Sequence, residues 1–584
     1  MKKVDPITLA VVRNNLISVA NGMQETAFRC AVTTFLYEIM DCSFSLLDDE
    51  AGVIAQAHGM LLFLGSLGPA VRNCIDLIGK ENLSPGDVIV AAHPDITGAH
   101  TSDALVFSPI FYKKRLFGFA ATKSHWLDLG AKDPFPTNSR SAFEEGLRIP
   151  PVRIYRKGVL QEEIWEIIKN NSRTPDAVWG DMQAQIAGCR FAEKGAAELI
   201  DRYGEATVRA CIGEMYDYSE RIIRQAIEEI PDGTYAAEDF MDDNGIDFDK
   251  PLRVRIAVTV KGSGMTIDLS GSCPEQPGPV NGLLISTLSG ARVAVKALFA
   301  PELPGNEGFN RPIKVIAPRG SIFNSTPGKP SFLHSWVAQT IMDLVNRALH
   351  KVLPERVPAL SGGDVVCEGF AGMDQKTGKY WGTLTPVVIG QGGDSASDGE
   401  SFLYPLSAGA CRNTPTEVLE STFPLTVDRC ELIPDSGGPG RHRGGVGSRT
   451  VFRLTTPGIF YAVIEKGKVP HWGIFGGKEG LRNYALVRSK NQGEFEVLKN
   501  PAVFLEAGDS VSVTAGGGGG FGDPLERDPE AVREDVIEGY VSPERARSDY
   551  GVVMKPGTLK IDEKATSRLR KGRTTAKSAK TALE

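Results

Sequence analysis

Residues 87–125 read DVIVAAHPDITGAHTSDALVFSPIFYKKRLFGFAATKSH, and this stretch decides the fold of the first quarter of the chain. The apolar run at 87–92 predicts a buried strand. Two further runs, at 105–112 and 116–122, predict strands that are joined by a hairpin. The sequence therefore alternates strands with short connections that contain glycine and polar residues.

Polar side chains gather where these strands end. The loop after the first strand carries His93, His100 and Asp103, and His125 follows the third strand, although the whole chain has only 8 histidines. Asp41 stands just before another predicted strand. Carboxylates and imidazoles that come from separate strand ends are suitable ligands for a divalent metal with open coordination positions.

The simpler explanation for any one of these histidines is a loop residue whose ring is satisfied by backbone hydrogen bonds. Two histidines and two acidic residues that recur at strand ends instead favour a metal or catalytic site. The predicted ligands are Asp41, His100, Asp103 and His125. The expected metal is a divalent ion, Zn, Mn or Fe, because oxygen and imidazole ligands do not choose sharply among these three.

Periodic patterns along the rest of the chain predict further elements. Apolar residues at helical spacing predict helices at 6–30, within 160–230, at about 284–299 and at 336–353. Alternating patterns and turn residues predict strands at 42–47, at 53–56, from 233 onward and through most of 400–520. The expected fold class is α/β mixed and multi-domain, with a β-rich core and helical layers.

The length of 584 residues predicts two to four domains, because domains usually contain roughly 100–200 residues. From Lys564 onward the chain has few large apolar side chains, which predicts a solvated tail. The expected regions are an N-terminal α/β region with the metal site (1–160), a helical region (161–232), a mixed sheet and helix core (233–430), a glycine-rich β region (431–550) and a C-terminal segment with a basic disordered tail (551–584).

Composition excludes several classes of protein. A net charge of −7 without a basic stripe argues against a nucleic-acid partner. The nine cysteines are scattered without a CxxC pair, which argues against a disulfide framework or a thiolate zinc site. No signal-like segment and no uninterrupted apolar run of membrane-spanning length is found, so a cytoplasmic location without a membrane partner is expected.

Two glycine-rich segments each allow two interpretations. Residues 437–445 combine a permissive backbone with Arg441, His442 and Arg443, which suits either an anionic ligand or a tight turn with exposed arginines. Residues 516–520 are consecutive glycines, for which close packing of backbone at a junction is favoured over close approach to a ligand. A phosphate-binding loop ending at Gly477-Lys478 also fails, because Trp472 stands where its first glycine is needed and Glu479 where serine or threonine is needed.

Five strings in order along the chain resemble the hydantoinase B/oxoprolinase family, the B component of N-methylhydantoinases. The resemblance covers about residues 4–545. The strings that carry it are DPITLAVVRNNL, EIMDCSFSLLDDEAGVIAQAHG, GDVIVAAHPDITGAHTSDALVFSPIFY, NTPTEVLESTFPLTVDRCELIPDSGGPGRHRGGVG and AGGGGGFGDPLERDPEAV.

The resemblance implies a metal-binding B subunit of an ATP-dependent cyclic amide hydrolase that opens rings such as N-methylhydantoin, 5-oxoproline or a lactam. It also implies a hydantoinase A-type partner that binds ATP and Mg. The alternative is the carboxylating subunit of a ketone carboxylase of the acetone or acetophenone type, which uses bicarbonate. A noncatalytic scaffold for the A subunit is the third interpretation.

The family's metal ligands correspond to the same four residues that the strand pattern selects. Asp128 is expected to be a catalytic base or to orient a ligand, with a strand-end cap as the alternative. His93 is expected to be a catalytic polar group of the pocket, and His58 a further pocket residue. Where the family often has a second histidine, this chain has Trp126, which implies an altered pocket.

Overall fold

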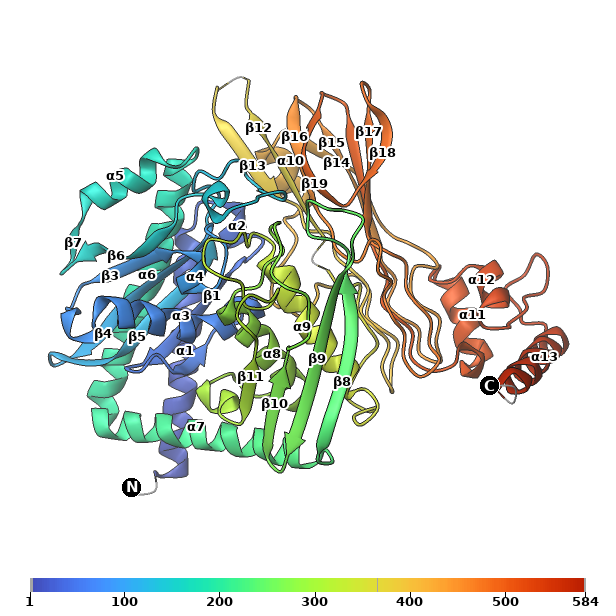
Figure 1. Ribbon diagram of the computed structural model, residues 1–584, viewed down its shortest axis with the longest axis horizontal. Coiled ribbons are helices and arrows are strands. Elements are labelled where there is room, and N and C mark those ends of the chain that lie inside the picture. Colours follow the sequence, from blue (N-terminus) through green and yellow to red (C-terminus); the bar gives the residue numbers. More distant parts are fainter. Residues whose placement is uncertain (1–3, 365, 376, 582–584) are drawn as a thin grey trace.

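The computed structural model describes residues 4–364, 366–375 and 377–581, and its N-terminal part is built on a seven-stranded antiparallel sheet (Figure 1). The strand order is β2-β1-β5-β4-β3-β6-β7. The strands are β1 (Cys42–Asp48), β2 (Val53–Gln56), β3 (Val88–Ala92), β4 (Asp103–Tyr112), β5 (Arg115–His125), β6 (Ile149–Arg156) and β7 (Val159–Leu160). The five strands predicted between residues 42 and 122 are confirmed.

Helices cover both faces of this sheet, because its strands alternate between two apolar clusters. Phe44 and Leu46 of β1 pack against α1, α6 and α7, whereas Leu47 packs on the opposite side against α3. The predicted helix at 6–30 is confirmed. The helices of this part are α1 (Pro6–Cys30), α2 (Thr34–Tyr37), α3 (Leu61–Ile78), α4 (Pro94–Thr97), α5 (Glu162–Asn170), α6 (Pro175–Tyr203) and α7 (Glu205–Glu228), with short 3-10 turns η1 (Lys80–Asn82) and η2 (Ala142–Glu145).

Helix α3 is long and apolar enough to cross a membrane by length and composition. Its 18 residues nevertheless include Arg72 and Asp76, and more than half of the helix is buried against the sheet and helix α8. The apolar composition of α3 is therefore explained by its position in the protein interior.

The second sheet packs against a pair of helices in the centre of the molecule (Figure 1). Val254 and Ile256 of the sheet share one large apolar cluster with Val295 of α8 and Ile341 of α9. The predicted helix at 284–299 is confirmed, and the one predicted at 336–353 begins and ends earlier. The elements are β8 (Gly233–Met241), β9 (Leu252–Lys261), β10 (Gly264–Asp268), β11 (Ile313–Ile316), α8 (Leu284–Phe299), α9 (His334–Leu349) and η3 (Glu307–Asn310), in the sheet order β11-β10-β9-β8.

Two further sheets form the β-rich part, and helix α10 lies beside the second of them. Their orders are β13-β12-β16-β19 and β14-β15-β20-β17-β18. The elements are β12 (Cys367–Met373), β13 (Tyr380–Leu384), β14 (Leu425–Leu432), β15 (Ser448–Leu454), β16 (Gly458–Val463), β17 (Tyr484–Ser489), β18 (Gly493–Val497), β19 (Lys499–Leu505), β20 (Ser510–Ala515) and α10 (Thr416–Thr422). This arrangement confirms the strand-rich prediction for 400–520 and the mixed α/β fold class.

The glycine-rich segments pack backbone against backbone. A Cβ atom on Gly518 would lie 1.9 Å from the carbonyl oxygen of Gln391, and its neighbours in 516–520 are similarly enclosed. In the other segment Arg443 pairs with Asp535 at 2.8 Å. Both observations favour structural roles over ligand binding.

The C-terminal segment contradicts the prediction of a disordered tail. Residues from Glu563 form helix α13, which is seen at the end of the chain in Figure 1. The Arg570 guanidinium donates hydrogen bonds to the carbonyls of Tyr550 and Arg527, at 2.9 and 2.8 Å. The prediction fails because it counted apolar side chains and ignored these polar contacts. The other elements here are η4 (Pro524–Glu526), α11 (Pro529–Ile537), α12 (Pro543–Ser548) and α13 (Glu563–Thr581).

Candidate metal centre

Two of the predicted ligands are direct neighbours across the β4–β5 hairpin. Asp103 begins β4 and pairs with His125, which ends β5. The His125 Nδ1 atom lies 3.1 Å from the Asp103 Oδ1 atom, and both side chains are buried. The sequence predicted these residues just outside the strands, but the ladder extends to include them. Their relative position is therefore fixed by strand pairing.

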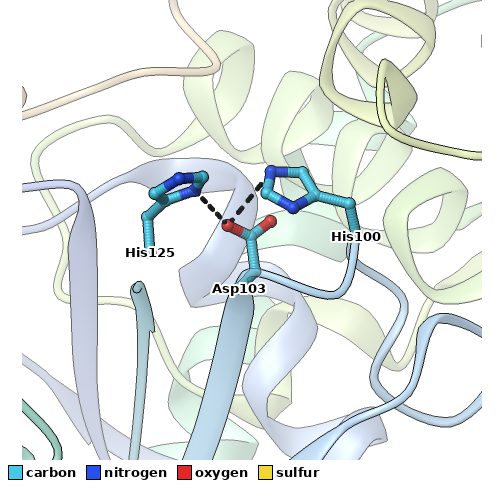
Figure 2. A group of neighbouring side chains, drawn as sticks. All are labelled: His100, Asp103 and His125. Atoms are coloured by element: carbon cyan, nitrogen blue, oxygen red, sulfur yellow. Dashed lines mark hydrogen bonds and ion pairs between the residues drawn. The ribbon is translucent and has the colours of Figure 1, made fainter. Parts of the chain in front are cut away.

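His100 reaches the same point from the loop after α4. The loop turns at Gly98, whose φ of 70° favours glycine, and a Cβ atom there would lie 2.3 Å from Ile285. The Ser102 N–H donates to His100 Nδ1 at 3.2 Å, so the opposite ring nitrogen, Nε2, faces Asp103 Oδ1 at 3.3 Å. Figure 2 shows the two imidazoles converging on this carboxylate.

A third histidine, His334, was missed by the sequence analysis. It is the first residue of α9, is 1% exposed, and places Nε2 3.3 Å from Asp103 Oδ2. The one local signal was a histidine at the start of an apolar helix after a segment rich in glycine and proline. Asp103 is thus contacted by imidazoles on both of its oxygens.

Asp41 lies at the same cavity in a strained turn. The preceding residue, Met40, has a φ of 58°, which strains the turn. The Asp41 backbone N–H donates to the carbonyl of Phe35 (2.9 Å), and the Asp41 carbonyl accepts from the N–H of His125 (3.1 Å). The Oδ1 atom of Asp41 is buried and has no hydrogen-bond partner among the described residues. A buried carboxylate oxygen without a donor is costly, which makes it a candidate cation ligand.

The charges of the cluster follow from burial and proximity. Burial opposes ionisation of Asp103, but the surrounding imidazoles outweigh it and hold the pKa of this carboxyl well below its usual range. Burial lowers the pKa of His100 to about 3. Burial also lowers the pKa of His125, but contact with Asp103 outweighs this effect and raises it. An ionised Asp103 beside a neutral His100 is the protonation state that metal binding requires, whereas His125 would have to lose its proton when a metal binds.

The cluster faces a small, partly open cavity of about 80 Å³. Aromatic side chains surround the ligands, including Phe332, whose ring centroid lies 4.9 Å from that of His100, and Phe35, which stacks on His125 at 5.0 Å. The other lining residues include Met60, Phe63, Phe135, Cys367, Tyr404 and Cys411. The site is therefore polar at one wall and apolar elsewhere.

Glu145 holds the segment that carries Phe332 in place. Its Oε1 atom accepts hydrogen bonds from the Ser331 and Phe332 N–H groups, at 2.9 and 3.0 Å, and from the Ser139 hydroxyl at 2.6 Å. Burial raises the pKa of Glu145 to about 7. The Glu145 carboxyl does not line the cavity. It fixes the position of Ser331 and Phe332, which precede His334 in the chain.

The donor set fits a divalent metal. The ligand atoms of His100, Asp103 and His125 lie within 4.8 Å of one another. Two imidazoles and a carboxylate at this spacing, with the unpartnered Asp41 oxygen at the same cavity, match the coordination chemistry of Zn, Mn or Fe.

Four other residues that the sequence analysis connected with the pocket lie apart from this cluster, and one of them, His58, lines a different cavity. The Asp128 carboxylate pairs with Arg173 at 2.6 Å and accepts from the Gly130 N–H at 3.1 Å, a geometry that favours the strand-end cap. His93 directly precedes α4 without a side-chain capping hydrogen bond and is not among the cavity-lining residues. Trp126 also does not line the cavity, since its buried indole donates to Gln185 at 2.8 Å.

The fold and the site define an α/β protein with a buried centre of carboxylates and imidazoles. The chain belongs to the hydantoinase B/oxoprolinase family, which it matches over residues 5–524. The β subunit of caprolactamase from Pseudomonas jessenii is 32% identical over 579 residues, covering 97% of this chain and 99% of that subunit. The crystal structure of ATP-dependent caprolactamase from this organism matches with a TM-score of 0.91 at 30% identity, covering 97% of this chain and 100% of the matched chain.

Two other relatives extend the comparison. A 5-oxoprolinase from Dictyostelium discoideum is 26% identical over 529 residues, which cover 89% of this chain but 40% of that longer protein. The nucleotide-free structure of acetone carboxylase matches with a TM-score of 0.91 at 20% identity, covering 99% of this chain and 84% of the matched chain. At this identity the second likeness shows the fold alone.

Proposed function

We propose that the chain is the metal-binding B subunit of an ATP-dependent cyclic amide hydrolase that works with an ATP-binding A subunit. The observation that carries this proposal is the convergence of three histidines on Asp103 beside a small cavity, within a chain similar to a caprolactamase β subunit along almost its whole length. The match to less than half of a 5-oxoprolinase supports a partner that supplies the remaining part.

The residues of the chain have separate tasks in this reaction. The four predicted ligands would hold a divalent ion, which when bound supplies Lewis acidity and lowers the pKa of a bound water. Asp103 orients the imidazoles of His100, His125 and His334 through its two oxygens. Phe332 and its aromatic neighbours exclude bulk water, which strengthens electrostatic interactions in the cavity.

ATP and Mg belong to the A subunit in this proposal, because the chain contains no recognisable phosphate-binding loop. An amide is resonance-stabilised, so its carbonyl needs activation before ring opening at neutral pH. A cytoplasmic location is part of the proposal and is supported by the nine cysteines, all of which are free thiols.

The test combines metal analysis with turnover. The chain is purified without chelator, alone and with a co-expressed A-type subunit, and assayed with a lactam, a hydantoin, 5-oxoproline, and a ketone plus labelled bicarbonate. Stoichiometric metal and ATP-dependent ring opening would support the proposal. Label in the product would instead identify a carboxylase, and full turnover by metal-free protein would reduce the chain to a scaffold.

The matched variants are His100→Ala, which removes a cavity ligand, and His350→Ala, which removes a histidine beyond the distant end of α9. The proposal expects metal and activity to be lost in the first variant and retained in the second.

A further inference from the structure

A second cavity, of about 620 Å³, shares a wall with the metal cavity. Met60 and Ala408 line the metal cavity, whereas their chain neighbours Gly59 and Gly409 line the second one. The Ala410 N–H donates to the Gly59 carbonyl at 3.4 Å, which ties the two segments of this wall together. The second cavity is thus adjacent to the metal centre but separate from it.

Two cationic side chains of α8 line the second cavity. Arg292 and Lys296 are four residues apart and therefore lie on one face of the helix. Within the described residues, Arg292 forms no ion pair within 4.0 Å, and its buried Nε atom has no hydrogen-bond partner. The Lys296 ammonium donates to the Ala300 carbonyl at 3.1 Å and likewise has no carboxylate within that distance in the described chain.

These cations lie in a partly desolvated environment. Burial lowers the pKa of Arg292 and also that of Lys296. Glu302 and Glu307 line the same cavity, yet neither approaches within ion-pair distance of the two cations in the described structure. The Glu307 and Glu302 carboxylates partly offset the burial of Arg292 and Lys296, respectively, but neither is in direct contact, so an anion bound at α8 would relieve the remaining cost.

We propose that this cavity binds a small molecule through a carboxylate or phosphate group held by Arg292 and Lys296. A guanidinium presents paired N–H donors that match both groups, and an ammonium adds a second charge. Glu302 and Glu307, elsewhere in the lining, favour a ligand that also carries an ammonium over one that is anionic throughout.

The two sources of such an anion follow from the proposed function, on which this choice of ligands rests. Opening a cyclic amide gives an amino acid with a free carboxylate, and ATP hydrolysis gives inorganic phosphate. The second cavity would therefore hold a reaction product next to the metal centre at which that product forms. Binding of either product in the second cavity would affect the wall that both cavities share.

The experiment measures binding of inorganic phosphate and of 6-aminohexanoate to the full chain by titration calorimetry. The variants Arg292→Gln and Lys296→Gln are each expected to weaken binding at least tenfold, and Arg292→Lys to weaken it less than Arg292→Gln. The matched control is Arg115→Gln, which removes the same charge from an exposed strand end. Absence of binding of both probes to the unaltered chain, or unchanged binding by Arg292→Gln, would overturn the proposal.

The failure of this site and that of the proposed function are distinguished by measuring metal in the same samples. If the chain binds a probe but no metal, the anion site is supported and the proposed function fails. If the chain binds metal but no probe, the proposed function is supported and the anion site fails. Tighter binding of 6-aminohexanoate than of phosphate assigns the carboxylate product. If neither probe binds and Arg292→Gln weakens assembly with the A subunit, the cavity is a docking site and the proposal fails.

Discussion

The Nε2 atom of His334 lies 3.3 Å from the Oδ2 atom of Asp103, although 231 positions separate the two residues along the chain. His100 and His125 contact the other oxygen of the same carboxylate. The first sheet and the central helix pair therefore meet at Asp103. The geometry of this cluster of histidines and Asp103 depends on packing between these two parts as well as on its local hairpin.

His334→Ala should lower metal affinity roughly 10–100-fold, which is the usual effect of losing a residue that orients a metal ligand. The affinity is measured by competition with a chelator, followed by elemental analysis of the protein. His350→Ala, beyond the other end of α9, serves as the control and should bind metal normally. Equal affinity in the two variants would show that His334 has no role in the centre.

Glu145→Gln should change how stability depends on pH. The pKa of Glu145 is about 7 in the folded chain, above its ordinary value of 4.5, so its contribution to stability is lost as pH rises from about 4.5 to about 7. A glutamine side chain does not titrate, so the variant lacks this loss of stability. The melting temperature of the variant minus that of the unaltered chain should therefore rise over that pH interval and then level off. The corresponding difference in free energy of unfolding changes by at most about 1.4 kcal/mol per pH unit. A constant difference would contradict the assignment.

Gly518→Ala should destabilise the glycine-rich junction by about 1–3 kcal/mol or more, because the new methyl group would lie 1.9 Å from the Gln391 carbonyl oxygen. Gly213→Ala, in helix α7, meets nothing within 4 Å and should be neutral or stabilising by about 0.5–1 kcal/mol. Thermal unfolding of the two variants gives the comparison. A tolerated Gly518→Ala would mean that the junction can expand.

Truncation after Asp562 should loosen the C-terminal segment and leave the metal content unchanged. The deletion removes Arg570 and also the Thr566 hydroxyl, which accepts from the Val553 N–H at 3.0 Å. Hydrogen exchange should therefore increase at 550–553 but not in β4. A shorter deletion after Arg573 keeps both contacts and should leave exchange at 550–553 unaltered. Loss of metal on truncation would connect this segment to the centre.

The isolated chain should hydrolyse no ATP, and hydrolysis that depends on a cyclic amide should require the A-type subunit. The reason is the absence of a recognisable phosphate-binding loop in the sequence. Phosphate release is measured for the chain, the partner and their mixture. ATP hydrolysis by the highly purified chain alone would contradict this prediction.

Local patterns were sufficient to predict many elements of this fold. The strand at 53–56 and the helix at 284–299 agree with β2 and α8, because alternation and helical periodicity depend on near neighbours. The prediction failed for α13, whose position depends on hydrogen bonds from Arg570 to distant carbonyls. Such contacts leave no periodic signal in the sequence.

The candidate site was predictable in part for the same reason. Asp103 and His125 belong to one hairpin, and His100 lies in the loop before it, so strand spacing alone brought them together. His334 comes from another part of the chain, and its approach depends on how the helices pack. Asp128 was selected because it follows His125 closely, but its partner Arg173 could be recognised only in three dimensions.

The volume of the cavity beside Asp103 has a consequence for the timing of the proposed reaction. About 80 Å³ is far less than the roughly 300–1,000 Å³ of ordinary small-molecule sites. A substrate of ordinary size would therefore need the walls to move apart, and such motions usually take microseconds to milliseconds. The frequency of this opening would set an upper limit on the rate of the proposed reaction.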